Sequence, residues 1–305
     1  MLRPSMRLSI IQAASCTVAL VLLLAGCAPG GATSSGTTPL RVLTTTTVFA
    51  DIVRNVGGDR VQVESIIPAG IGPEDYEPAP GDAKKLADAD LIVSNGVGLD
   101  DFLDRLIEAA GHGHAARLVL GDGIPTIKVG GESNPHFWLD PSLVVQYYLP
   151  AIEAKLSALD PADATTFVQR EGAYAAEVSA MDAGARVELD TIPVADRKLV
   201  TAHDAFPYFA AHYGFTLIGV ILENVGQEPT AADMAALVGT VKAAHVHAIF
   251  SESQFNPALA NALATEAGIT EVVTTLYNDT LGPPPADTYL GMMRWNIEHI
   301  VQALK

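Results

Sequence analysis

The sequence predicts an α/β protein with two lobes, each holding a four-stranded parallel sheet flanked by helices, joined by one long α-helix. Short apolar runs alternate with stretches of helical periodicity, which is the pattern of βαβ units and parallel sheets. The apolar runs form two sets of four on either side of an alanine-rich segment. The expected strands are 40–45, 61–67, 91–94 and 117–120, then 198–201, 216–221, 248–251 and 271–276, with helices that include 82–89, 100–110 and 231–243.

The segment between the two sets predicts the long helix. Asp160-Pro161 is a helix start, with a capping residue followed by proline at the first helical position. No further proline appears before Leu189, although Gly172 and Gly184 weaken the helix. About 29 residues at 1.5 Å each give a rod of roughly 43 Å, long enough to cross both lobes. The alternative is a shorter helix that breaks at Gly184. An unbroken rod would make a wide hinge motion difficult.

The first 26 residues have the organisation of a secretory signal peptide. Arg3 and Arg7 precede a largely apolar, uncharged stretch from residue 10 to residue 24. The Leu-Ala-Gly-Cys sequence that follows resembles the lipobox of bacterial lipoproteins, which implies cleavage before Cys27 and acylation of its sulfur. An uncleaved membrane anchor is the alternative, but the apolar stretch is short for a full membrane span.

Residues 27–39 are expected to be the lipidated cysteine and a flexible tether, because positions after Cys27 carry only small residues, threonine and proline. Ordered structure should then begin with an N-terminal lobe at 40–155. A linking helix at 156–190 and a C-terminal lobe at 191–305 follow. The only other cysteine lies inside the signal peptide, so a disulfide framework and a thiolate metal site are both excluded.

The charge of the chain limits the classes of partner. The formal net charge is −17, from 18 basic and 35 acidic residues. Such a surface repels nucleic-acid phosphates, so a nucleic-acid partner is not expected. The same charge attracts cations, although an acidic surface more often serves solubility. With 305 residues, 49% of them hydrophobic, the chain can bury two cores of ordinary size.

Four polar side chains follow predicted strands, at the end of a parallel sheet where ligands bind. Each lies about 60 to 80 residues from the next, which excludes a local metal motif and requires a site assembled at the seam between the lobes. Taken singly, each has an ordinary alternative as a solvated loop acid, a packed or capping histidine, or a turn aspartate. The four are Glu74 after the second strand, His136 after the fourth, His203 after the fifth and Asp279 after the last.

The segments around these positions resemble those of the manganese- and zinc-binding solute-binding proteins of ABC importers, which are often lipoproteins. The likeness runs in order over nearly the whole mature chain. It implies two four-stranded lobes joined by a long helix, one metal ion between them, and ligands at His136, His203 and Asp279. The matching segments are Tyr-Glu-Pro at 76–78, Asn-Gly at 95–96, Pro-His-Phe-Trp-Leu-Asp-Pro at 135–141, His-Asp-Ala-Phe at 203–206, and 289–296.

Glu74 departs from the family pattern, which reads Pro-His-x-Tyr-Glu-Pro where this chain reads Pro-Glu-Asp-Tyr-Glu-Pro. Either Glu74 replaces the histidine, or three protein ligands and water hold the ion. Two imidazoles and two carboxylates make a harder site than three histidines, which favours Mn(II) or Fe(II). The Irving–Williams order favours Zn(II) over Mn(II). We therefore expect one divalent ion, Zn(II) or Mn(II), with Fe(II) less favoured.

His112 and His114 stand in a Gly-His-Gly-His turn. The turn resembles a much-reduced form of the histidine-rich loop that some zinc members of the family carry, which would make it an accessory metal loop. The ordinary alternative is a pair of exposed loop residues.

These features predict an extracytoplasmic, membrane-anchored lipoprotein, at the cell surface or periplasmic face, that delivers a transition-metal ion to the permease of an ABC importer without catalysis. We expect a monomer whose membrane contact is the lipid on Cys27. One alternative is a metal-dependent hydrolase using the same residues, although the sequence has no His-Glu-x-x-His, Gly-x-Ser-x-Gly or phosphate-loop motif. The other is a surface adhesin, because members of this family have been called adhesins, although nothing in the sequence encodes an adhesive surface.

Overall fold

The structure is a computed structural model that describes residues 38–109, 114–223 and 225–305. The expected signal peptide, Cys27, most of the tether and His112 lie outside the described residues. Residues 39–305 form one compact unit. Among the described residues, no helix has the length and apolar character needed to span a membrane.

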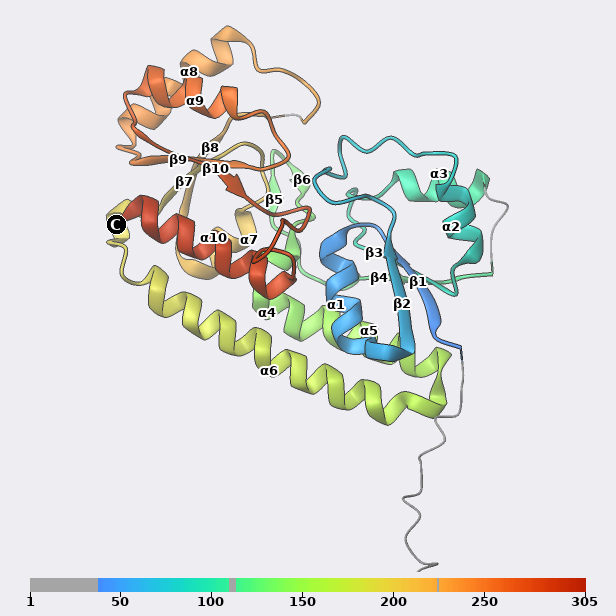
Figure 1. Cartoon of the computed structure of the whole chain (residues 1–305). Helices are drawn as coiled ribbons and strands as arrows, with labels where there is room; N and C mark the ends of the chain where they lie inside the picture. The colour runs from blue at the N-terminus through green and yellow to red at the C-terminus, as the bar shows by residue number, and fades with distance from the viewer. Residues whose placement is uncertain (1–37, 110–113, 224) are drawn as a thin grey trace, which may run out of the picture. The chain divides into compact units, whose positions relative to one another are not determined.

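The first sheet has four parallel strands in the order β2-β1-β3-β4 (Figure 1). Consecutive side chains of a strand point to opposite faces. On β1, Val42 therefore packs against α1 in one core cluster, whereas Leu43 packs against α2 and α3 in another. The predicted strands of this set are confirmed to within two residues at each end. The elements are β1 Leu40–Thr44, α1 Thr47–Gly57, β2 Val61–Ser65, α2 Asp82–Asp88, β3 Leu91–Ser94, α3 Phe102–Ala109 and β4 Ala116–Val119, followed by a short hairpin of β5 Lys128–Val129 and β6 Glu132–Ser133.

The second set of strands forms two hydrogen-bonded parallel pairs, β7 with β8 and β9 with β10, and β7 lies beside β9. The four parallel strands are confirmed, but one continuous four-stranded ladder is not formed. Both pairs contain a register shift, and the side chain of Glu252 at the end of β9 accepts the backbone N–H of Ala202 just after β7. The elements are β7 Lys198–Thr201, α7 Pro207–Tyr213, β8 Thr216–Val220, α8 Ala231–Ala243, β9 Ala248–Glu252, α9 Pro257–Ala267, β10 Glu271–Leu276 and α10 Tyr289–Leu304.

The long helix α6 spans Ala164–Leu189, after a 3₁₀ turn at Pro161–Asp163. Its 26 residues give a rod of roughly 39 Å, and neither glycine breaks it. In Figure 1 the rod runs past α5 and α1 at one end and α10 at the other. Its buried residues recur every three, four or seven positions, so they form one stripe along the helix. They are Phe167, Tyr174, Val178, Met181, Ala185 and Leu189.

The helix before the rod contains a π-helical turn. Helix α4 (Pro141–Leu143) leads through this turn at Val144–Tyr148 into α5 (Leu149–Leu159). Pro150 has no backbone N–H to donate to the preceding turn, and the wider turn accommodates that missing bond. Residues 156–159, expected within the linking helix, belong to α5. The predicted lobe boundaries remain predictions.

One hydrophobic core cluster runs through both sets of strands and the rod, and includes Phe49 of α1, Phe167 of α6 and Tyr289 of α10. Hydrogen bonds in this interior join distant segments. The indole N–H of Trp138 donates to the carbonyl of Asn278 (2.8 Å), and the Tyr289 hydroxyl donates to the carbonyl of Trp138 (2.8 Å). A wide separation of the lobes would therefore expose part of a shared interior.

His212 of α7 links the rod to the segment before α4. Its Nδ1 lies 2.9 Å from a carboxylate oxygen of Asp140, and its Nε2 lies 2.8 Å from one of Asp182 on α6. Burial lowers the pKa of His212, but the two carboxylates outweigh burial and raise it to about 9. The guanidinium of Arg186 lies 2.7 Å from the same Nε2, and its positive charge works against protonation of the imidazole.

We predict that His212→Gln destabilises the protein more at pH 6 than at pH 10. Because the folded-state pKa is raised from 6.5 to about 9, the stabilisation is full below pH 6.5 and is lost as the pH rises through 9. The expected loss in free energy of unfolding is roughly 2 to 3 kcal/mol at pH 6 and much less at pH 10, measured by urea denaturation. The exposed His247→Gln is the control. Equal losses at both pH values would contradict the prediction.

Candidate metal centre

The four side chains predicted from the sequence converge on one place. Each offers a donor atom, and these atoms all lie within 4.8 Å of one another. Glu74 comes from the loop between β2 and α2, and His136 lies just after β6. His203 comes from the loop after β7, and Asp279 comes from the loop after β10. The last three are buried, whereas Glu74 is exposed.

His136 is oriented by Asn134. The side-chain oxygen of Asn134 lies 3.1 Å from Nδ1 and also accepts the backbone N–H of His136. An amide oxygen can only accept, so Nδ1 donates and Nε2 faces the centre. There Nε2 lies 3.3 Å from Oδ1 of Asp279, and within the described residues neither buried atom has a hydrogen-bond partner. Two unpaired buried polar atoms that face each other fit a cation bound between them.

His203 is oriented by Glu252, whose carboxylate is fully buried. One oxygen of Glu252 lies 2.9 Å from Nδ1 of His203, and the other accepts the backbone N–H of Ala202 at 2.9 Å. Phe255 packs against the other side of the imidazole, with ring centroids 4.9 Å apart. A carboxylate behind a histidine fixes the ring and its tautomer, as in many metal sites. The Nε2 atom of His203 then faces Asp279, 3.4 Å from Oδ2.

Asp279 lies between the two imidazoles, with Oδ1 toward His136 and Oδ2 toward His203. Burial raises the pKa of Asp279, but the two imidazoles outweigh burial and hold it well below its usual range. The pKa of His203 moves in the matching direction. Burial lowers it, but Glu252 and Asp279 outweigh burial and hold it well above its usual value.

Glu74 differs from the other three. Although the residue as a whole is exposed, burial of its carboxylate raises the pKa of Glu74, and the negative charge of Asp279 raises it further. A β-carbon added at Gly72 would lie 3.2 Å from Oε2 of Glu74 and 3.9 Å from Oδ2 of Asp279. A side chain at Gly72 would therefore crowd the Glu74 carboxylate, whereas its distance from Asp279 would be an ordinary contact. Within the described residues, we find no hydrogen bond between the Glu74 side chain and another residue.

The sequence did not reveal the residues that hold these side chains in place. Asn134, Glu252 and Gln254 contact His136, His203 and Asp279 respectively. Glu252 gave the one available signal, because it is a carboxylate at the end of an otherwise largely apolar strand. All five residues of that strand, β9, are buried.

His114, expected in an accessory metal loop, is exposed and lies 3.8 Å from Asp90. No candidate metal cluster among the described residues includes it. Its predicted partner His112 lies outside the residues that the structure describes, so the accessory metal loop remains a prediction.

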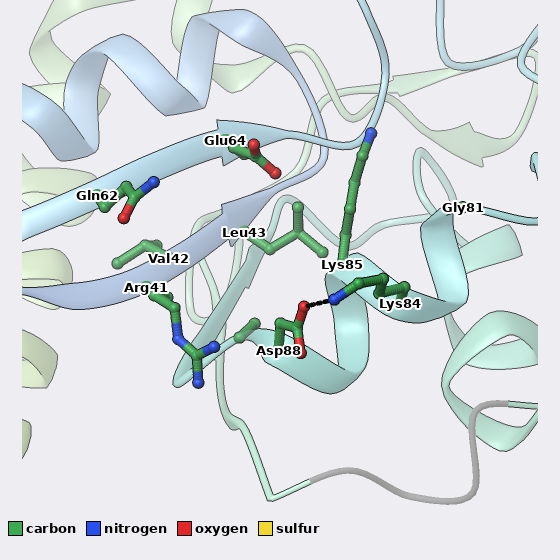
Figure 2. A pocket seen from close by; sticks show the side chains of 10 residues that line it. Arg41, Val42, Leu43, Gln62, Glu64, Gly81, Lys84, Lys85 and Asp88 are labelled. Atoms are coloured by element: carbon green, nitrogen blue, oxygen red, sulfur yellow. Dashed lines mark hydrogen bonds and ion pairs between the residues drawn. The ribbon is translucent and has the colours of Figure 1, made fainter.

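A hollow of about 430 Å³ opens beside Glu74, lined by Tyr76, Leu99 and Phe102 among others. It gives Glu74 a side facing solvent. A separate hollow of about 350 Å³ lies between the first sheet and α2 (Figure 2). Its basic side chains each lie beside an aspartate: Arg41 with Asp90, Lys84 with Asp88, and Lys85 with Asp82. Each of these basic side chains therefore already has a carboxylate as its partner.

Comparison with known proteins gives a consistent result. Residues 42–303 match the family described as zinc-uptake complex component A, periplasmic. The manganese-binding lipoprotein MntA of Halalkalibacterium halodurans is 30% identical over 292 residues, covering 93% of this chain and 95% of that protein. The iron ABC transporter substrate-binding lipoprotein MtsA of Streptococcus pyogenes is 28% identical over 296 residues, with coverage of 93% and 95%. The structure of the periplasmic zinc-binding protein TroA from Treponema pallidum matches with a TM-score of 0.80 at 31% identity, covering 87% of this chain and 99% of that chain.

We predict that Glu252→Gln weakens metal binding about 10- to 100-fold, although Glu252 cannot touch the ion. Both of its oxygens accept N–H groups, and a glutamine offers only one acceptor. The variant therefore loses the bond to Ala202 or turns its amide toward His203, which would move the imidazole proton onto Nε2. Competitive metal titration measures the loss, and the exposed Glu271→Gln is the control. Unchanged affinity in a folded variant would refute the role of Glu252.

Proposed function

The chain belongs to the family of zinc-uptake complex component A proteins, and on this premise we propose that Glu74, His136, His203 and Asp279 hold the ion that it transports. The family consists of substrate-binding proteins of ABC importers, which are not enzymes. The chain is therefore an extracytoplasmic binding component that works with a permease and an ATPase. The hydrolase and adhesin alternatives gain no support from these relatives.

The observation that carries the ligand proposal is the meeting of two imidazoles and two carboxylates from four distant loops. Within the described residues, Nε2 of His136 and Oδ1 of Asp279 are buried without hydrogen-bond partners. A buried polar atom without a partner is unfavourable. A divalent cation would satisfy both atoms at once, and two carboxylates would balance its charge.

The substrate is a divalent transition-metal ion. Imidazole nitrogen and carboxylate oxygen suit Zn(II), Mn(II) and Fe(II). The relatives point to the same three metals, since one is named as a manganese-binding protein, one as part of an iron ABC transporter and one as a zinc-binding protein. We propose Zn(II) or Mn(II) as the cargo, with Fe(II) less favoured.

Release follows from the unequal support of the four ligands. His136, His203 and Asp279 are buried and held by neighbouring side chains, whereas Glu74 is exposed on the long loop 66–81 between β2 and α2. Withdrawal of that loop would remove one of four ligands while the shared core stays closed. We therefore propose that Glu74 leaves the ion first.

The membrane attachment is also a proposal. The two lipoprotein relatives named above agree with the lipobox at Cys27. Acylation there, followed by the tether at 28–39, would keep the binding protein near its permease, because about 12 extended residues reach at most roughly 40 Å. A single copy holds all four proposed ligands, which favours a monomer.

We predict that Glu74→Ala weakens metal binding by well over tenfold, or ~1.4 kcal/mol and more. The variant removes one of four proposed ligands and one of two negative charges. Protein beginning at Ala28 would be analysed for bound metal, then titrated competitively with Zn(II) and Mn(II). The matched control is Glu77→Ala, an exposed glutamate of the same loop. An unaltered affinity would assign that corner of the site to water or to another side chain.

For Cys27→Ala, we predict that the full-length protein moves from the membrane fraction to the soluble extracytoplasmic fraction and no longer incorporates a labelled fatty acid. Metal affinity should stay unchanged, because the substitution lies outside the proposed site. Fractionation and lipid labelling in a bacterial host measure both effects. Retention of the variant in the membrane would instead support an uncleaved anchor.

A further inference from the structure

The loop after β9 places one more side chain against a proposed ligand. The amide nitrogen of Gln254 lies 2.9 Å from Oδ2 of Asp279 and 2.8 Å from Oδ1 of Asn278. An ionised carboxylate can only accept hydrogen bonds, so the nitrogen of Gln254 has to face it. The orientation of this amide is therefore set by Asp279.

This orientation leaves the other end of the amide unsatisfied. The side-chain oxygen of Gln254 is buried and has no hydrogen-bond partner within the described residues. A buried, unpaired acceptor destabilises a fold and calls for a reason. The opposite orientation would put that oxygen against the carboxylate of Asp279, so the unpaired oxygen is the consequence of holding Asp279.

Gln254 also lies next to the loop that carries Glu74. A β-carbon added at Gly72 would lie 3.7 Å from Cγ of Gln254. The same β-carbon would lie 3.2 Å from Oε2 of Glu74. One side chain thus hydrogen-bonds the second-lobe carboxylate and lies beside Gly72 of the first-lobe loop. Rotation of the Asp279 carboxylate would break the bond to Gln254.

We propose that Gln254 is a positioning residue that keeps both oxygens of Asp279 directed at the ion and thereby sets the preference between metals. The inference rests on the proposed function. In the orientation that Gln254 holds, Oδ1 faces His136 at 3.3 Å and Oδ2 faces His203 at 3.4 Å. An ion between the imidazoles then has two aspartate oxygens within reach instead of one.

The number of oxygens matters differently for the two candidate metals. Zn(II) is satisfied by four donors, which one atom from each of the four ligands supplies. Mn(II) favours six-coordinate, oxygen-rich surroundings and so gains from the second oxygen of Asp279. Loss of the Gln254 amide should therefore cost more affinity for Mn(II) than for Zn(II).

The test is Gln254→Met, which keeps the length of the side chain and removes the donor. Competitive titration of protein beginning at Ala28 should show a loss of about 10- to 100-fold for Mn(II) and a smaller loss for Zn(II). Bound Co(II) should absorb more strongly in the visible region, as expected when its coordination number falls. The exposed Gln169→Met is the matched control and should change neither affinity nor spectrum.

Equal losses for both metals with an unchanged Co(II) spectrum would overturn the proposal, as would unchanged affinities. If circular dichroism shows that Gln254→Met does not fold, Gln254→Asn decides between the same outcomes, because the shorter amide does not reach Asp279. Failure of the proposed function gives a different result, since the unsubstituted protein would then bind neither Zn(II) nor Mn(II).

Discussion

Carboxylates gathered around two buried imidazoles need positive charge between them. Burial disfavours an isolated charged carboxylate, yet the imidazoles hold the pKa of Asp279 below its usual range. Glu252 and Asp279 in turn raise the pKa of His203. A proton on His203 can supply positive charge when no ion is bound. A divalent cation would replace that proton, because a histidine ligand has to offer an unprotonated nitrogen.

The fold brings these charges together by joining loops that are distant in the sequence. The carboxyl ends of parallel strands present their loops at one edge of a sheet, where ligands collect. The indole of Trp138, two residues after His136, donates to the carbonyl of Asn278, the residue before Asp279. The core around this bond also includes the buried stripe of α6. The distance between the ligand loops is therefore set by the packed interior of the protein.

The sequence was enough to predict the elements and the four proposed ligands, but not the residues that support those ligands. Strand and helix periodicity is local, which is why β3, β7 and β10 were predicted with their observed bounds. Glu252 does not stand out in the sequence, because an acidic residue after a strand usually belongs to a solvated loop. Its role depends on His203, 49 positions away in the chain. Gln254 has no sequence signal at all, because a glutamine shows its function only through the groups it contacts.

The uneven support of the four proposed ligands would reconcile tight capture with release. Asn134, Glu252 and Gln254 hold His136, His203 and Asp279 in a buried frame, and such preorganisation lowers the cost of binding an ion. A site with four equally buried ligands could release its ion only by separating the lobes, which the shared core opposes. Glu74 lies outside that frame on an exposed loop. As the proposed fourth ligand, its carboxylate would add charge to the closed site, and the loop could withdraw it without disturbing the core.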